Sequence, residues 1–163
     1  MVEAMEAAPP EAGYERDFFA WTQAQAAALR AAAHGGVNLA IDWQNVAEEI
    51  ESLGKSQATA LRSRLRTIIE HLLKLEFSPA REPVLGWRDT VMRSRVDFDD
   101  DITDSPSLRQ RVGGWIEQEH RAAVRLVEFN LREHGELMRE VEERLRARRF
   151  AEEEVLGDWF PAE

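Results

Sequence analysis

Glu117 and His120, within the stretch IEQEH, have the spacing by which one helix of a bundle offers two ligands to a di-iron centre. Such a centre needs the same motif on a second helix, but His71 is preceded by Thr67 and Ile68 and not by a glutamate. At 100° per residue, Glu117 points away from the apolar face of its helix and His120 lies at its edge. The sequence therefore predicts no metal and no other cofactor. A metal-dependent enzyme built from His71, His120 and Glu117 is the alternative.

A second stretch, DFDDDITDS, places oxygen-bearing side chains at alternate positions from Asp97 to Ser105, as the first ligands of a calcium-binding loop are placed. The sixth position of such a loop is a glycine and the twelfth is a glutamate. Ile102 and Leu108 occupy these positions here. We therefore expect an acidic linker that ends one helix near Asp97 and caps the next.

Basic residues cluster in two places, but their pattern does not favour nucleic-acid binding. Alternate spacing scatters them around a helix, and glutamates are interleaved with the second cluster. The net charge of −10 also repels a polyanion. We therefore expect a solvated, salt-bridged surface from Arg62, Arg64, Arg66, Arg144, Arg146, Arg148 and Arg149.

Several polar residues fall on the apolar faces of predicted helices. Glu119 lies at the centre of its stripe, and Arg95 lies between Val91 and Phe98. A buried carboxylate needs a partner, so we expect Glu119 to meet an arginine, His71 or another protein. The candidate residues of a polar core or interface are Glu119, Arg95, Arg88, Glu51 and His71.

Hydrophobic periodicity predicts the helices that position these residues. The first covers about 17–33, with Phe18, Trp21, Gln25 and Ala28 along one side. The second covers about 43–77, from the capping residue Asp42 to Ser78-Pro79, and either runs straight through Gly54 or kinks there. Its stripe comprises Trp43, Val46, Ile50, Ala58, Leu61, Leu65, Ile68, Leu72 and Leu75.

Three further helices are expected in the second half of the chain. The third ends near Asp97, the fourth runs from Ser105-Pro106 to about His134, and the fifth covers about 136–150. The fourth carries a predicted apolar face of Leu108, Val112, Trp115, Ala122, Leu126 and Phe129.

These patterns predict an all-α, single-domain bundle of about five helices over residues 14–163, preceded by a disordered tail over residues 1–13. The chain has 163 residues and no cysteine, which excludes a disulfide framework and fits a reducing compartment. No stretch has the length and apolarity of a membrane span. We expect a cytoplasmic protein that does not enter a membrane.

Five segments in order, YERDFFAW, DWQNVAEEIESLGKS, LRSRLRTIIEHLLK, GWR and DSPSLR, resemble the bacterial family known as domain of unknown function 29. The resemblance extends from about Tyr14 to Phe160. It implies an all-helical bacterial domain and supplies no catalytic residues. Members of the family end in a proline-containing aromatic segment, of which RRFAEEEVLGDWFP is a shortened form.

The sequence favours a regulatory or adaptor module that binds a protein partner or a second copy of itself, with Trp159 and Phe160 as the candidate contacts. The lack of a phosphate-binding loop or an activated nucleophile favours a role other than catalysis. The alternatives are the metal-dependent enzyme described above and a small regulator of nucleic-acid or toxin–antitoxin type.

Overall fold

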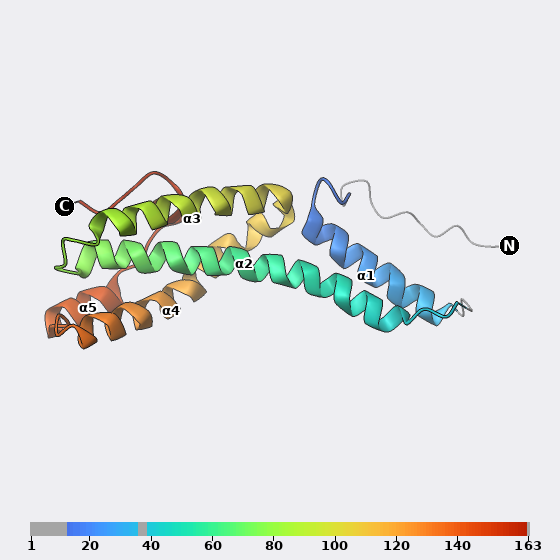
Figure 1. Ribbon diagram of the computed structural model, residues 1–163, viewed down its shortest axis with the longest axis horizontal. Helices are drawn as coiled ribbons and strands as arrows, with labels where there is room; N and C mark the ends of the chain where they lie inside the picture. The colour runs from blue at the N-terminus through green and yellow to red at the C-terminus, as the bar shows by residue number, and fades with distance from the viewer. Residues whose placement is uncertain (1–12, 36–38, 163) are drawn as a thin grey trace. The chain divides into compact units, whose positions relative to one another are not determined.

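The computed structural model describes residues 13–35 and 39–162, and every regular element in this part of the chain is a helix. The all-α class is thereby confirmed. The tail expected over residues 1–13 lies outside the described residues except for Gly13. In chain order the elements are α1 (Phe18–His34), α2 (Trp43–Phe77), α3 (Val84–Asp104), the 3-10 helix η1 (Pro106–Arg111), α4 (Val112–Glu133), α5 (Arg139–Ala147) and α6 (Glu152–Leu156) (Figure 1).

The chain forms two compact units. Unit 1 consists of Met1–Thr59 and Asp101–Arg109, and unit 2 consists of Ala60–Asp100 and Gln110–Glu163. The expectation of a single bundle domain stays a prediction. Among residues 13–35 and 39–162, no helix combines the length and the apolar character that crossing a bilayer demands.

In unit 1, α1 and the first half of α2 form an antiparallel hairpin (Figure 1). Asp17 caps α1 through its carboxylate, which accepts a 2.8 Å hydrogen bond from the Ala20 amide. The helices approach closely at Gly54, where an added Cβ atom would overlap the Oγ1 of Thr22 and lie 3.3 Å from the Phe19 ring. Gly54 is thus a close-contact point inside a continuous helix.

Unit 2 has a core built from the second half of α2 and the helices that follow it. The core side chains are almost all aliphatic and lie at three- and four-residue spacings along each helix, which is why the sequence pattern predicts helices here. They are Leu61, Leu65, Ile68, Ile69, Leu72, Leu73, Val91, Phe98, Val112, Ala123, Val127, Leu131, Leu145, Phe150 and Val155.

The predicted bounds of α2 are confirmed. The predicted end of α3 near Asp97 was wrong. Helix α3 continues through the acidic stretch to Asp104. Phe98 and Ile102 are 2% and 5% exposed and continue the buried positions Val91 and Arg95. Burial of these two side chains outweighs the weak helix propensity of the three aspartates between them, of which Asp99 and Asp100 are exposed and Asp101 is half-buried.

The fourth predicted helix is also corrected. Its first turns are the 3-10 helix η1, so α4 begins only at Val112. Its buried face is rotated from the predicted one, because Leu126 and Phe129 are 45% and 62% exposed while Ala123 and Val127 are buried. Helix α5 packs against α4.

The end of the chain also differs from the prediction. Helix α5 is shorter than expected, since it covers only Arg139–Ala147. The short α6 was not predicted. It begins after Ala151, whose amide donates a 2.7 Å hydrogen bond to the Glu154 carboxylate.

Candidate functional site

Glu119 lies in unit 2 between two arginines of α2. It is 4% exposed. Its Oε1 accepts a 2.8 Å hydrogen bond from Arg62 Nε, and its Oε2 lies 3.2 Å from Arg66 Nε. Both arginines are partly exposed, so they neutralise the carboxylate while keeping contact with water. Glu119 therefore meets the arginine partners that its place on the apolar face requires.

His120 was expected at the edge of the apolar face, but it is only 3% exposed. The rotation of the buried face of α4 accounts for the difference. The ring centroid lies 5.9 Å from that of Phe150, and Nε2 is buried without a hydrogen-bond partner. Burial lowers the pKa of His120 to about 4, helped by the positive charges of Arg149 and Arg148. The ring is therefore neutral at physiological pH.

The other residues of the alternative metal site are not brought together. His71 is half-buried and its Nδ1 makes a 2.9 Å hydrogen bond with the carbonyl of Thr67, one turn earlier. Glu117 is exposed. Within the described part of the chain, no three histidine or carboxylate side chains converge as metal ligands would.

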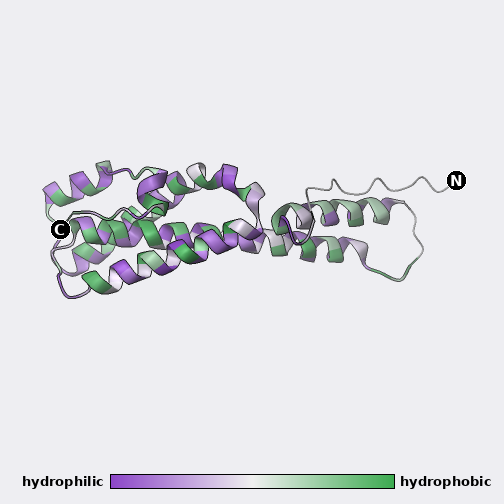
Figure 2. Ribbon diagram, turned by 90° about the horizontal axis from the view of Figure 1, so that it is seen from above, coloured by the Kyte–Doolittle hydropathy of each residue, from purple (hydrophilic) through white to green (hydrophobic). Residues whose placement is uncertain are grey.

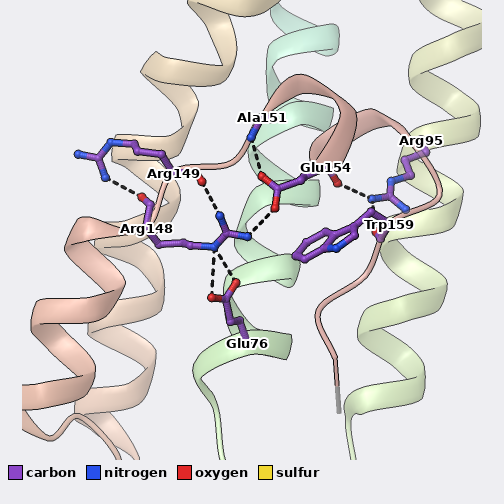
Figure 3. A network of polar contacts seen from close by, with 7 residues as sticks. All are labelled: Glu76, Arg95, Arg148, Arg149, Ala151, Glu154 and Trp159. Atoms are coloured by element: carbon purple, nitrogen blue, oxygen red, sulfur yellow. Dashed lines mark hydrogen bonds and ion pairs between the residues drawn. The ribbon is translucent and has the colours of Figure 1, made fainter.

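Arg95 holds the C-terminal segment of unit 2 in place (Figure 3). Although it is 6% exposed, its Nε donates to the carbonyl of Val155 at 2.9 Å. Its Nη2 donates to the carbonyls of Glu154 and Trp159, both at 2.8 Å. One guanidinium therefore satisfies three carbonyls of a segment that makes few regular backbone hydrogen bonds.

Trp159 and Phe160, the candidate partner contacts, pack against their own unit. The guanidinium carbons of Arg88 and Arg95 lie 4.2 and 4.9 Å from the centroid of the Phe160 ring. The Trp159 ring lies 5.9 Å from that of Phe150. Both side chains are half-buried, so they offer little free apolar surface.

Arg148 is a second anchor of this segment that the sequence did not reveal. Its Nε lies 2.9 Å from Glu76 Oε2 and its Nη2 lies 2.7 Å from Glu154 Oε1 (Figure 3). The guanidinium carbon also lies 4.1 Å from the centroid of the Phe150 ring. Its partners Glu76 and Glu154 lie 72 and 6 residues away in the sequence, so helical spacing does not connect either glutamate with Arg148. These polar contacts hold the segment to unit 2.

Glu51, the remaining candidate, belongs to unit 1. Its carboxylate pairs with Arg30 of α1 at 2.5 Å and with Lys55 of α2 at 3.2 Å. The hydrogen bond from Arg30, and then that from Lys55, lowers the pKa of Glu51. The pair thus joins the two helices of the hairpin.

A second apolar face runs along the same hairpin. Helix α1 contacts α2 through Phe19, Thr22 and Ala26, and α2 contacts α1 through Ala47 and Gly54. The apolar sides that the sequence pattern predicted for the two helices therefore lie outside this contact. The remaining positions on one side of each helix are eight apolar residues and two glutamines, and they repeat at alternating spacings of three and four along the sequence. Figure 2 shows hydrophobic residues along both helices of the hairpin. We call these ten residues the hairpin face: Phe18, Trp21, Gln25, Ala28, Ala32, Trp43, Val46, Ile50, Leu53 and Gln57.

The α1 and α2 halves of the hairpin face lie on one side of the hairpin. At 100° per residue, the α1 residues centre about 120° from the direction of α2, and the α2 residues centre about 70° from the direction of α1. Both rotations have the same sense about the helix axes. Because the helices are antiparallel, the two halves form one surface.

The hairpin face is half-covered at best. Val46 and Leu53 are 40% and 51% exposed, and the other eight residues are intermediate in exposure. Tyr14, itself exposed, extends the face, with its ring centroid 5.6 Å from Phe18 and 5.0 Å from Trp21. A depression of about 400 Å³ opens beside it, lined by Tyr14, Glu15, Phe18, Gln57 and Asp104. This continuous apolar surface is the strongest candidate for a binding site.

Comparison with known proteins identifies the family. The chain matches the family described as domain of unknown function DUF29 over residues 14–154, so it belongs to that family. It is similar to an alpha-helical protein of unknown function from Rhodospirillum rubrum, with 25% identity and a TM-score of 0.71 over 91% of this chain and 92% of that chain. No curated protein matches the chain. The family resemblance is thus confirmed, and it assigns no activity.

Proposed function

We propose that this chain is a protein-interaction module and that the hairpin face is its binding surface. The observation that carries the proposal is an apolar pattern of helical period on both helices of a two-helix hairpin, of which Val46 and Leu53 remain substantially exposed. A sequence maintains such a pattern against solvent exposure where another surface covers it. The partner chemistry that fits is an uncharged helical surface.

The charged groups of the chain support a binding role more than a catalytic one. Glu119, Arg95, Arg148 and Glu51 all have partners within their own unit. None of them lines the depression beside Tyr14. A binding module needs no more than this, because its affinity comes from a central apolar cluster with a polar rim.

Site-specific photo-cross-linking in cells tests the proposal. A benzophenone amino acid replaces Leu53 on the hairpin face, or Ser52 as the control, which is exposed on the opposite side of α2. We expect a discrete protein adduct from position 53 and at least about tenfold less from position 52, because only the face is covered by a partner. Equal yields at the two positions, or no adduct from position 53, would overturn the proposal.

A further inference from the structure

We infer that the partner of the hairpin face is a second copy of this chain, which packs face to face and antiparallel to complete a four-helix bundle. This inference rests on the proposed function of the face. The hairpin packs one side of α1 against α2 and contacts the segment Asp101–Arg109 near Phe19 and Gln57. Val46 and Leu53 of its second apolar face stay exposed, because no described element of the unit covers them. When two such hairpins pair, each covers the second apolar face of the other, as in up-and-down four-helix bundles.

The distribution of charge fits a second copy. None of the ten residues of the hairpin face is charged, although 32% of the chain is. Two copies with a net charge of −10 each repel one another unless they meet through a neutral surface. The flank of α1 is neutral as well, since Ala20, Ala24, Ala27 and Ala31 occupy it. The face is therefore the surface through which two acidic copies can approach without bringing like charges together.

The sizes of the side chains are also self-complementary. On α1 the large rings of Phe18 and Trp21 lie at one end of the face, and the small Ala28 and Ala32 lie at the other. An isologous pair, in which α1 of one copy runs antiparallel to α1 of the other, places the large end of each over the small end of its partner. The rings fill the space that the alanines leave.

The centres of the two halves of the face lie at the same level. Thr22 of α1 touches position 54 of α2. Because the helices are antiparallel, Gln25 lies level with Glu51, next to Ile50. Gln25 and Ile50 are the middle residues of their halves, so a single two-fold axis can pass through both residues. On that axis the Gln25 amide meets its own copy and can both donate and accept a hydrogen bond.

The depression beside Tyr14 fits the same arrangement. When two α2 helices pair antiparallel about Ile50, position 57 of one copy meets position 43 of the other. The Trp43 ring of the second copy then lies over the depression that Phe18 lines together with Tyr14, Glu15, Gln57 and Asp104. Within its own copy, Gln57 Oε1 accepts a 2.8 Å hydrogen bond from Ser105 Oγ, so the Trp43 ring packs on a fixed side chain. A large aromatic ring over an open depression is the type of contact that dominates binding energy at protein interfaces.

Cysteine cross-linking tests this geometry in the full-length chain. The chain has no native cysteine, so Gln25→Cys introduces its only thiol, and Ala27→Cys is the control at an exposed position off the face. Under mild oxidation we expect disulfide-linked dimers of Gln25→Cys, with at least about tenfold less dimer from Ala27→Cys, because only residue 25 lies near its own copy. No dimer from Gln25→Cys, or equal yields from both variants, would overturn the inference.

A charge swap at the same position gives a second, independent result. Gln25→Glu and Gln25→Lys should each raise the dissociation constant of the dimer at least about tenfold, because each buries two like charges together. An equimolar mixture should recover a mixed dimer, since the charges are then opposite. Circular dichroism checks that both variants fold. A mixture that stays monomeric, or single variants that dimerise as the wild type does, would contradict the two-fold contact.

The two proposals fail in different ways. If the cross-linker at position 53 captures a different protein while Gln25→Cys forms no dimer, the face is a binding surface and the second copy is wrong. If position 53 captures nothing, the proposed function fails and the second copy fails with it.

Discussion

His120 links the stability of unit 2 to pH. Its pKa is lowered from 6.5 to about 4 by burial, so the unfolded chain binds a proton that the folded chain rejects. The stability that this group contributes is present above pH 6.5 and is lost as the pH falls toward 4. We expect the free energy of unfolding to fall by roughly 2 kcal/mol between pH 7.5 and pH 5 from this residue alone. Urea denaturation at several pH values measures it.

The variant His120→Gln isolates this effect, because glutamine does not titrate. Glu51 and Glu154 also have lowered pKa values, but their contribution is lost only as the pH falls below about 4.5. The stability of the variant should therefore be nearly flat between pH 7.5 and pH 5. A slope as steep as that of the wild type would mean that His120 is not buried as described.

Glu119 and its arginines predict an asymmetry between the two halves of one ion-pair cluster. The double change Arg62→Leu and Arg66→Leu leaves a buried carboxylate unpaired and should cost about 3 kcal/mol or more. Glu119→Leu removes the buried charge and leaves arginines that reach water, so it should change stability by less than about 1 kcal/mol. Chemical denaturation of the variants compares them.

An exposed ion pair serves as the control for this comparison. Arg93 and Asp89 lie 2.7 Å apart with side chains 76% and 61% exposed, so Arg93→Leu should leave the free energy of unfolding nearly unchanged. If Glu119→Leu proves as costly as the double arginine change, the carboxylate contributes through packing or through a role other than the one described.

At the scale of the element, Gly54 sets the distance between α1 and α2. Gly54→Ala should destabilise the chain by about 1 to 3 kcal/mol, although alanine favours helix, because the new Cβ atom overlaps the Oγ1 of Thr22. Gly114→Ala is the matched control, since Gly114 is also helical and nothing lies within 4 Å of its added Cβ, and it should stabilise by up to about 1 kcal/mol. Thermal unfolding compares the two variants.

A double-mutant cycle identifies the contact. Thr22→Ala removes the overlapping oxygen, so the cost of Gly54→Ala should shrink in that background. If the unfolding free-energy changes of the two substitutions are additive, the strain lies elsewhere in the hairpin and not at the contact with Thr22.

The sequence predicted α2 well because its signals are local. Asp42 accepts a 3.2 Å hydrogen bond from the Asn45 amide at the start of the helix, and Pro79 forbids its continuation at the end. The end of α3 depends instead on burial of Phe98 and Ile102 by distant parts of the chain. Periodicity alone cannot weigh that burial against the low helix propensity of aspartate.

The sequence predicted part of the hairpin face as apolar but did not predict its exposure. The pattern that includes Phe18, Trp21, Val46 and Ile50 was correctly recognised as apolar faces of two helices. A sequence pattern shows which face avoids water but not which surface covers it. The pattern therefore did not reveal that the hairpin buries Phe19 and Ala47 and leaves these faces partly exposed. The partners of Arg95 escaped prediction for a related reason, because they are backbone carbonyls of a distant segment.

At the scale of the whole molecule, the hairpin face is an apolar surface that the described residues leave exposed at Val46 and Leu53. Unit 2 packs a continuous aliphatic core and pairs Glu119 with Arg62, and its C-terminal segment is held by Arg95 and Arg148. Unit 1 consists of the hairpin and the segment Asp101–Arg109, whose Ser105 Oγ accepts a hydrogen bond from the Phe19 amide and donates one to Gln57 Oε1. Outside this contact the hairpin face leaves Val46 and Leu53 exposed, so its burial depends on a partner.

Sedimentation equilibrium of the purified, untagged chain tests this claim most directly. We expect a mass that rises with concentration toward twice the 18.7 kDa of one chain. Leu53→Glu should return it to that of the monomer by burying an unpaired charge, and Ser52→Glu, with the same charge on the opposite side of α2, should leave it unchanged. A wild-type chain that stays monomeric up to roughly 100 µM, or equal effects of the two variants, would contradict pairing of two copies through the hairpin face.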